Sequence, residues 1–241
     1  MCVLLVHHRV REDAPVVLLA NRDEDYARAF DPPTRWPGPA GVVAPRDQRA
    51  GGTWLGTNAS GLVAAITNRP TKSPRRGVRS RGLLTADVLA RTDAADARRW
   101  LSGHLRATAY DPFNLMVLDR AAGFVVHHGA AGAEWTDLAP GAHVLTNLHD
   151  LDVAPVPAEG LPREGEPLAS LLARLERLAA DRETPLPGDH RICKVGRTRG
   201  TVCSAVLALP QDARAPTVFR FATGPPHVTP FRDAPASGGP A

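Results

Sequence analysis

Cys2 is the residue of this sequence best placed to do chemistry, because it directly follows the initiator methionine. A small residue at this position normally allows removal of the methionine, which would leave Cys2 with a free α-amino group. The ordinary pKa of such a group lies close to neutrality, so one residue then has both a thiol and a base. The amine of such an N-terminal nucleophile accepts the thiol proton, the thiolate attacks a carbonyl, and the protonated amine serves the leaving group. The alternative is a buried cysteine that acts as a small hydrophobe.

The polar run 21–24, Asn-Arg-Asp-Glu, directly follows an apolar run. If that apolar run pairs in antiparallel fashion with the apolar start of the chain, Asn21 and Asp23 come close to Cys2. A carboxylate there would hold and orient the α-ammonium group. Arg22 could lower the thiol pKa, or clamp a substrate carbonyl or carboxylate. The alternative is a solvated turn.

Two asparagines end apolar runs, and both occur as Thr-Asn: Asn68 closes 62–68 and Asn147 closes 143–147. An asparagine amide is a neutral donor suited to a developing oxyanion, and the alternative for each is a turn-capping residue. Trp54 lies in a glycine-rich segment and could line a ligand cleft. Trp54 and Asn21 are therefore the candidate substrate-binding residues.

The charge of the chain gives little support to nucleic-acid binding. The 241 residues have 29 basic and 25 acidic side chains, a net charge of +4, and only Lys72 and Lys194 are lysines. The one basic run, 75–81, has no interleaved aromatic residues for stacking on bases, which favours a solvated loop. We therefore expect no nucleic-acid partner.

Other classes are also disfavoured by composition. No apolar run approaches the roughly 20 residues that span a bilayer, and the start of the chain lacks the features of a secretion signal, so a cytoplasmic location is expected. Three cysteines without a Cys-x-x-Cys pair support neither a disulfide framework nor a zinc site. The histidine pairs 7–8 and 127–128 give no reason to converge on a metal. We expect no metal and no cofactor, and the sequence indicates no oligomeric state.

The elements that must position these residues are mostly strands. Apolar runs 2–7 and 15–20 predict a hairpin, and 201–209 with 217–222 predict a later one. Further strands are expected at 41–44, 53–56, 61–67, 114–119, 123–128 and 143–146, and helices at 83–92, 94–104 and 167–181. Asp93 is a plausible N-cap, and the leucines of 167–181 form a helical stripe typical of core packing. Strands at both ends with helices between them favour one α+β domain with layered sheets.

Several short motifs together resemble a known family. They are Met1-Cys2, Asn21-Arg22-Asp23-Glu24, Gly51-Gly52-Thr53-Trp54-Leu55-Gly56, Ala64-Ala65-Ile66-Thr67-Asn68, Ser80-Arg81-Gly82-Leu83-Leu84, Phe113-Asn114-Leu115 and His143-Val144-Leu145-Thr146-Asn147. In this order they resemble the NRDE family, the homologues of the transport and Golgi organisation protein 2. That family is similar to N-terminal nucleophile hydrolases of the bile-salt hydrolase and penicillin V acylase type. The resemblance implies a four-layer αββα sandwich of two stacked, mainly antiparallel sheets, here a single domain 1–232 with a disordered tail 233–241.

The resemblance also implies roles for individual residues. Cys2 matches the nucleophile of those amidases, and Asp23 matches the acid beside its amine. Asn68 and Asn147 match two asparagines near the oxyanion. Asn21 matches the asparagine of their Arg-Asn-x-Asp motif.

The chain departs from the pattern at two arginines. Ala20 stands where the arginine before Asn21 is expected, so Arg22 is the candidate to supply the charge. Val202 stands in place of the arginine of a Gly-Thr-Arg motif, with Arg199 just upstream.

Two functions follow from these patterns. The first is an N-terminal cysteine hydrolase that cleaves a linear amide bond of a small amphipathic substrate, with Cys2, Asp23, Asn68, Asn147 and Arg22 as catalytic residues. The two missing arginines favour the alternative, a non-catalytic ligand-binding or trafficking protein on the same fold. Haem or an acyl-CoA-like molecule would be its ligand, with His7 or Cys2 as a possible axial ligand of haem.

Overall fold

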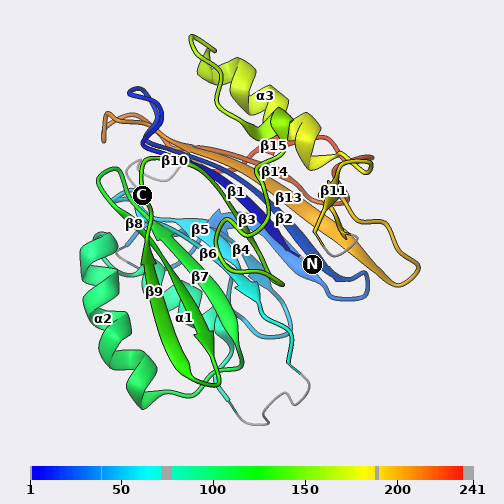
Figure 1. Ribbon diagram of the computed structural model, residues 1–241. Helices are drawn as coiled ribbons and strands as arrows, with labels where there is room; N and C mark the ends of the chain where they lie inside the picture. The colour runs from blue at the N-terminus through cyan, green and yellow to red at the C-terminus, as the bar shows by residue number, and fades with distance from the viewer. Residues whose placement is uncertain (1, 39, 72–77, 188–189, 236–241) are drawn as a thin grey trace.

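Apolar strands buried on both faces form the centre of this protein. A computed structural model describes residues 2–38, 40–71, 78–187 and 190–235. Two antiparallel sheets are stacked face to face, and helices cover the outer face of each (Figure 1). The α+β, four-layer αββα sandwich expected from the sequence is therefore confirmed.

The first sheet contains the start of the chain and both predicted hairpins. Its strands lie in the order β10 (Gly141–Thr146), β1 (Val3–His8), β2 (Val16–Asp25), β13 (Arg199–Leu209), β14 (Val218–Ala222) and β15 (Arg232–Asp233). Val3 pairs with Asn21 on β2 and with Thr146 on β10. This register brings the polar end of β2 and the end of β10 to the two sides of Cys2.

The second sheet follows the chain closely, because neighbouring strands are joined by short connections or by a pair of helices. Its order is β3 (Phe30–Arg35), β4 (Val43–Asp47), β5 (Leu55–Thr57), β6 (Val63–Asn68), β7 (Phe113–Leu118), β8 (Gly123–Gly129) and β9 (Gly132–Asp137). A short pair, β11 (Pro185–Leu186) with β12 (His190–Arg191), and a 3₁₀ turn at Ala158–Gly160 lie outside the two sheets.

Helices α1 (Arg81–Leu89) and α2 (Ala94–Ala107) cover the second sheet, and α3 (Leu168–Ala179) covers the first (Figure 1). Asp93 caps α2 as predicted, since its side chain accepts a hydrogen bond from the backbone of Asp96. The leucine stripe of α3 is buried against the first sheet, which confirms its assignment to core packing.

Alternate residues of β1 face different layers, and this parity decides which side chains can reach a site between the sheets. Leu4 and Val6 belong to the core between the sheets, whereas Val3 and Leu5 belong to the layer beneath α3. Cys2 has the parity of Leu4 and therefore faces the second sheet.

The structure corrects the sequence reading at several places. The polar run 21–24 is part of strand β2 and not a turn that follows it. Strand β2 continues through Asp25, and this part of it pairs with β13, while Asn21 also pairs with β1. Strand β3 was not predicted because it contains Pro32 and Pro33, and β9 was not predicted because its residues are mostly exposed. The expected tail 233–241 begins inside β15, while residues 236–241, and 75–77 of the basic run, lie outside the described residues.

Candidate functional site

Five of the residues singled out from the sequence lie on one cavity. It opens to solvent and is lined in part by Cys2, Arg22, Asp23, Trp54 and Asn68. These residues come from both sheets, so the cavity lies where the sheets meet at one end of the sandwich. The wall opposite is the start of α1.

The glycine-rich motif explains how that wall comes so close. A Cβ added to Gly52 would lie 2.1 Å from the backbone carbon of Gly82, so only glycine allows the two segments to touch. The backbone N–H of Thr53 donates to the carbonyl of Gly82 at 3.0 Å, which fixes the start of α1 against the segment that leads into Trp54. Ser80, the N-cap of α1, also lines the cavity.

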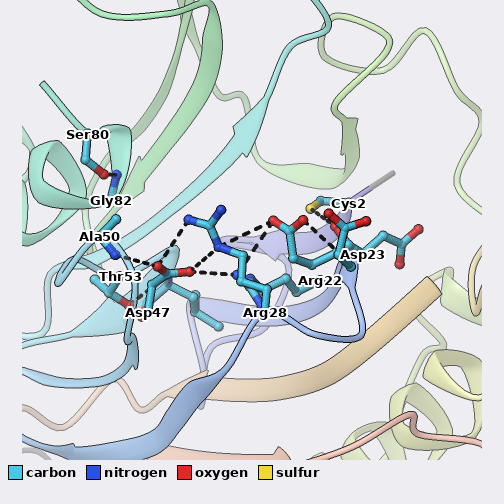
Figure 2. A network of polar contacts seen from close by, with 12 residues as sticks. Cys2, Arg22, Asp23, Arg28, Asp47, Ala50, Thr53, Ser80 and Gly82 are labelled. Atoms are coloured by element: carbon cyan, nitrogen blue, oxygen red, sulfur yellow. Dashed lines mark hydrogen bonds and ion pairs between the residues drawn. The ribbon is translucent and has the colours of Figure 1, made fainter. Parts of the chain in front are cut away.

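Cys2 is held by Asn147 through two backbone-directed contacts. The N–H of Cys2 donates to Oδ1 of Asn147 at 3.1 Å, and the N–H of Asn147 donates to the carbonyl of Cys2 at 3.3 Å. The Cys2 sulfur lies 3.9 Å from the carbonyl oxygen of Asp23 (Figure 2). Asn147 is thus brought to Cys2 as expected, but as a clamp on its backbone rather than as a cavity-lining residue.

The surroundings of Cys2 do not favour a standing thiolate. Burial raises the pKa of the Cys2 thiol, and the negative charge of Asp23 raises it further. Nearby Arg22 opposes this, but less strongly. A nucleophilic Cys2 therefore needs a base that removes its proton during attack.

Asp23 lies beside Cys2 and is itself largely buried, with 7% of its surface exposed. Its Oδ1 accepts a hydrogen bond from the hydroxyl of Thr201 at 2.7 Å. Burial raises the pKa of the Asp23 carboxyl, while the hydrogen bond from Thr201 and the charge of Lys194 act in the opposite direction.

Arg22 belongs to a buried charge network that the sequence analysis missed (Figure 2). Its guanidinium lies 4.2 Å from the centre of the Trp54 ring, and its Nη2 donates to Asp47 at 2.9 Å. Asp47 also accepts from Arg28 at 2.7 Å and from the backbone of Ala50 at 2.8 Å. Much of the charge of Arg22 is therefore already neutralised, although its buried Nη1 makes no hydrogen bond within the described part of the chain.

Asn68 and Asn21 end up in opposite environments. Asn68, the last residue of β6, is exposed on the cavity wall, where no side-chain hydrogen bond to another described residue occupies its amide. Asn21 is buried on the α3 side of the first sheet, and its Nδ2 donates to the carbonyls of Ala179 and Ile192, both at 2.9 Å. This placement gives Asn21 a structural role that joins α3 to the sheet, away from the cavity.

The two positions that lack the expected arginines are apolar core. Ala20 and Val202 are 5% and 7% exposed and pack between the sheets. Arg199 does not replace the missing charge there, because it is exposed and pairs with Glu24 and Asp25 at the start of β13.

His7 does not join Cys2 at the cavity. It faces the α3 side of the sheet, where its Nε2 contacts the carbonyl oxygen of Gly160 at 2.7 Å. Within the described ranges, no three His, Cys, Asp or Glu side chains are grouped so that they could hold a metal ion. None of the helices described is both long and apolar enough to cross a membrane.

Comparisons with solved structures show which fold this is. Penicillin V acylase from Agrobacterium tumefaciens superposes with a TM-score of 0.61 at 15% identity, covering 93% of this chain and 84% of that one. A variant of conjugated bile acid hydrolase from Clostridium perfringens gives 0.54 at 11% identity over 100% and 99% of the two chains. The Caenorhabditis elegans orthologue of N-acylethanolamine-hydrolyzing acid amidase gives 0.53 at 14% identity, over 97% and 100%. At these identities the likeness shows the fold alone.

Sequence comparisons show the family. The transport and Golgi organization protein 2 homologue of Bos taurus is 35% identical over 144 residues, and that of Homo sapiens is 33% identical over 144 residues. Each alignment covers 55% of this chain and 50% of the relative, so the chain spans about half the length of the curated relatives it matches. The family model described as Transport and Golgi organisation 2 matches residues 1–157. This chain belongs to the Transport and Golgi organisation 2 family.

Proposed function

We propose that this protein is an N-terminal cysteine hydrolase that cleaves a linear amide bond of a small amphipathic molecule. The observation that carries the proposal is the placement of Cys2, whose thiol lines the cavity while its backbone nitrogen is held by Asn147 and a buried carboxylate, Asp23, lies beside it. Solved proteins of the same fold are named for action on amides, among them an acylase and an acid amidase.

The reaction needs no partner residue for the thiol. Once Met1 is removed, the α-amine of Cys2 accepts the thiol proton and the sulfur attacks the amide carbon. The C–N bond then breaks, the leaving amine takes the proton, and the acyl group remains on sulfur as a thioester. Water, deprotonated by the same amine, hydrolyses the thioester to a carboxylic acid and restores the thiol. Asp23 stabilises the ammonium that forms at each proton transfer.

The cavity supplies the remaining parts. Asn68, at the end of β6, lines the cavity and brings an amide donor to it, and donors of this kind stabilise an oxyanion. Trp54 and Ile66 line the cavity together with Arg22, Arg28 and their acidic partners, so the lining is divided between apolar and charged groups. A substrate with an apolar acyl group and a polar leaving group fits this division.

Asn68 gives a prediction specific to the oxyanion. Asn68→Ala is expected to lower kcat by about a hundredfold or more, because one donor is lost at the developing charge. Thermal stability should stay unchanged, since the side chain is exposed and makes no described hydrogen bond. Asn68→Asp, which keeps the shape but loses the donor, should behave in the same way. A normal kcat in both variants would remove Asn68 from the mechanism.

The proposal is tested by intact mass together with a thiol-reactive probe near neutral pH. We expect the purified protein to lack Met1 and to be labelled at Cys2 far faster than at the buried Cys193 or Cys203. Retained Met1 would block the α-amine and exclude the mechanism as written.

A second function is favoured by the apolar replacements at Ala20 and Val202. Without those charges, the same cavity would serve a protein that binds a small amphipathic ligand without turning it over. Substrate-like ligands would then protect Cys2 from the probe, yet remain intact in the presence of the protein. The cytoplasmic location expected from the sequence stays a prediction.

A further inference from the structure

Thr201 reaches the site because of an irregularity in β13. Along β13 and β2, Thr201 pairs with Asp23 and Cys203 pairs with Arg22, so Val202 is an extra residue in the ladder. A β-bulge of this kind turns neighbouring side chains to new directions and is frequent beside active sites. Here it places the hydroxyl of Thr201 against the carboxylate of Asp23, 178 residues away in the sequence.

The direction of this hydrogen bond follows from a second contact. The backbone N–H of Lys194 donates to Oγ1 of Thr201 at 2.8 Å and occupies one acceptor position of the hydroxyl. An ionised carboxylate can only accept, so the hydroxyl hydrogen of Thr201 points to Oδ1 of Asp23 at 2.7 Å. Thr201 is fully buried, so water does not compete for this bond.

We propose that Thr201 is a positioning residue that keeps Asp23 ionised and fixed beside the α-amine of Cys2. This inference rests on the proposed function, because it assigns a role in the same site. Thr201 itself does not touch the reacting atoms. It acts through the carboxylate, which must be negative to stabilise the ammonium formed during each proton transfer.

Several other groups act on Asp23. The Cys2 thiol faces it from the residue before β1, and Lys194, Cys193 and Cys203 face it from β13 and the segment before it. Removal of Met1 would add the α-amine of Cys2 on the same side. The thiols bear no charge at neutral pH, since burial raises the pKa of each. The hydrogen bond from Thr201 and the positive charge of Lys194 therefore oppose the burial that raises the pKa of Asp23.

The test compares Thr201→Val and Thr201→Ala with Thr201→Ser, because Ser and Ala differ only in the hydroxyl. The carboxyl carbon of Asp23 is followed by NMR in the full-length chain during a pH titration, with Asp23→Asn to assign the signal. Without the hydroxyl, the Asp23 titration should move up by about one pH unit, as expected for loss of a hydrogen bond to a charged group. Thr201→Ser should titrate close to the unchanged protein. Ser204→Ala, which loses a buried hydroxyl on the same strand that bonds to Asn21, should not move the titration.

The outcomes separate this inference from the proposed function. If the protein hydrolyses amides, the acidic limb of its pH–rate profile should move up by the same amount in Thr201→Val and Thr201→Ala, and return in Thr201→Ser. A shift in the NMR titration without any amide turnover would support the Thr201–Asp23 coupling and count against hydrolysis. An unchanged titration in a folded Thr201→Ala or Thr201→Val variant would overturn the inference, whatever the activity.

Discussion

Replacing Cys2 with alanine is expected to lower kcat/KM for N-acyl amide substrates by on the order of a thousandfold or more, because the acyl intermediate of the proposed mechanism forms on the Cys2 sulfur. The side chain removed is small and only partly buried, so the fold should be kept. The measurement is steady-state turnover on a panel of N-acyl substrates with different apolar acyl chains and polar leaving groups.

The matched control is Cys203→Ala. Cys203 is a buried thiol of the core between the sheets and is not part of the cavity lining, so turnover should stay close to that of the unchanged protein. Thiol labelling near neutral pH should disappear in Cys2→Ala and persist in Cys203→Ala. Equal turnover by Cys2→Ala and the unchanged protein would end the proposal of cysteine catalysis.

The second large effect is on stability. Asp47→Asn is expected to lower the free energy of unfolding by about 3 kcal/mol, because the buried guanidinium of Arg22 and the half-buried one of Arg28 lose the nearer of their two shared counter-ions and keep only Glu24, at 3.8 Å from each. Burial alone would raise the pKa of Asp47, but hydrogen bonds from Arg28 and from the backbone of Ala50 keep it below its ordinary value. A carboxyl with a lowered pKa contributes stability above its unfolded-state pKa and loses it as the pH falls through its folded-state pKa. The Asn variant should therefore lose less stability on acidification than the unchanged protein.

The control for this prediction is the exposed pair of Arg98 and Asp137. Asp137 is about three-quarters exposed, so Asp137→Asn should cost less than about 1 kcal/mol. Urea unfolding monitored by tryptophan fluorescence gives both values. If Asp47→Asn cost no more than Asp137→Asn, the network around Arg22 would not be a structural support of the cavity.

The arrangement of the cavity gives a physical reason for the departures from the arginine pattern. Ala20 and Val202 fill the core between the sheets, while Arg22 brings a guanidinium to the cavity from the neighbouring position on β2. Arg22 is held by Asp47 and by the face of Trp54, so its guanidinium is fixed near the thiol, with much of its charge neutralised, rather than being a mobile clamp.

Local patterns of the sequence were sufficient for the strands around Cys2. Short apolar runs with turn residues between them predicted both hairpins, and the leucine spacing predicted α3. From the first hairpin alone, Asp23 could be placed near Cys2, because antiparallel pairing relates residues by a simple register. Such features depend on neighbours in the sequence, which is why they can be read without the structure.

The sequence by itself determined the nucleophile candidate, the hairpin that presents it and the family to which its motifs point. Only the tertiary structure decided that Asn147 clamps Cys2 from 145 residues away, that Asp47 neutralises Arg22, and that Thr201 supports Asp23. The tertiary structure also decided that the Asn21 side chain faces α3. The composition of the polar run indicated a turn, but β2 continues through these residues, and the alternation of side chains along the strand places Asn21 on the α3 side. The physical reason is that these contacts are set by how two sheets stack and where a bulge falls, and no local preference of the chain encodes either.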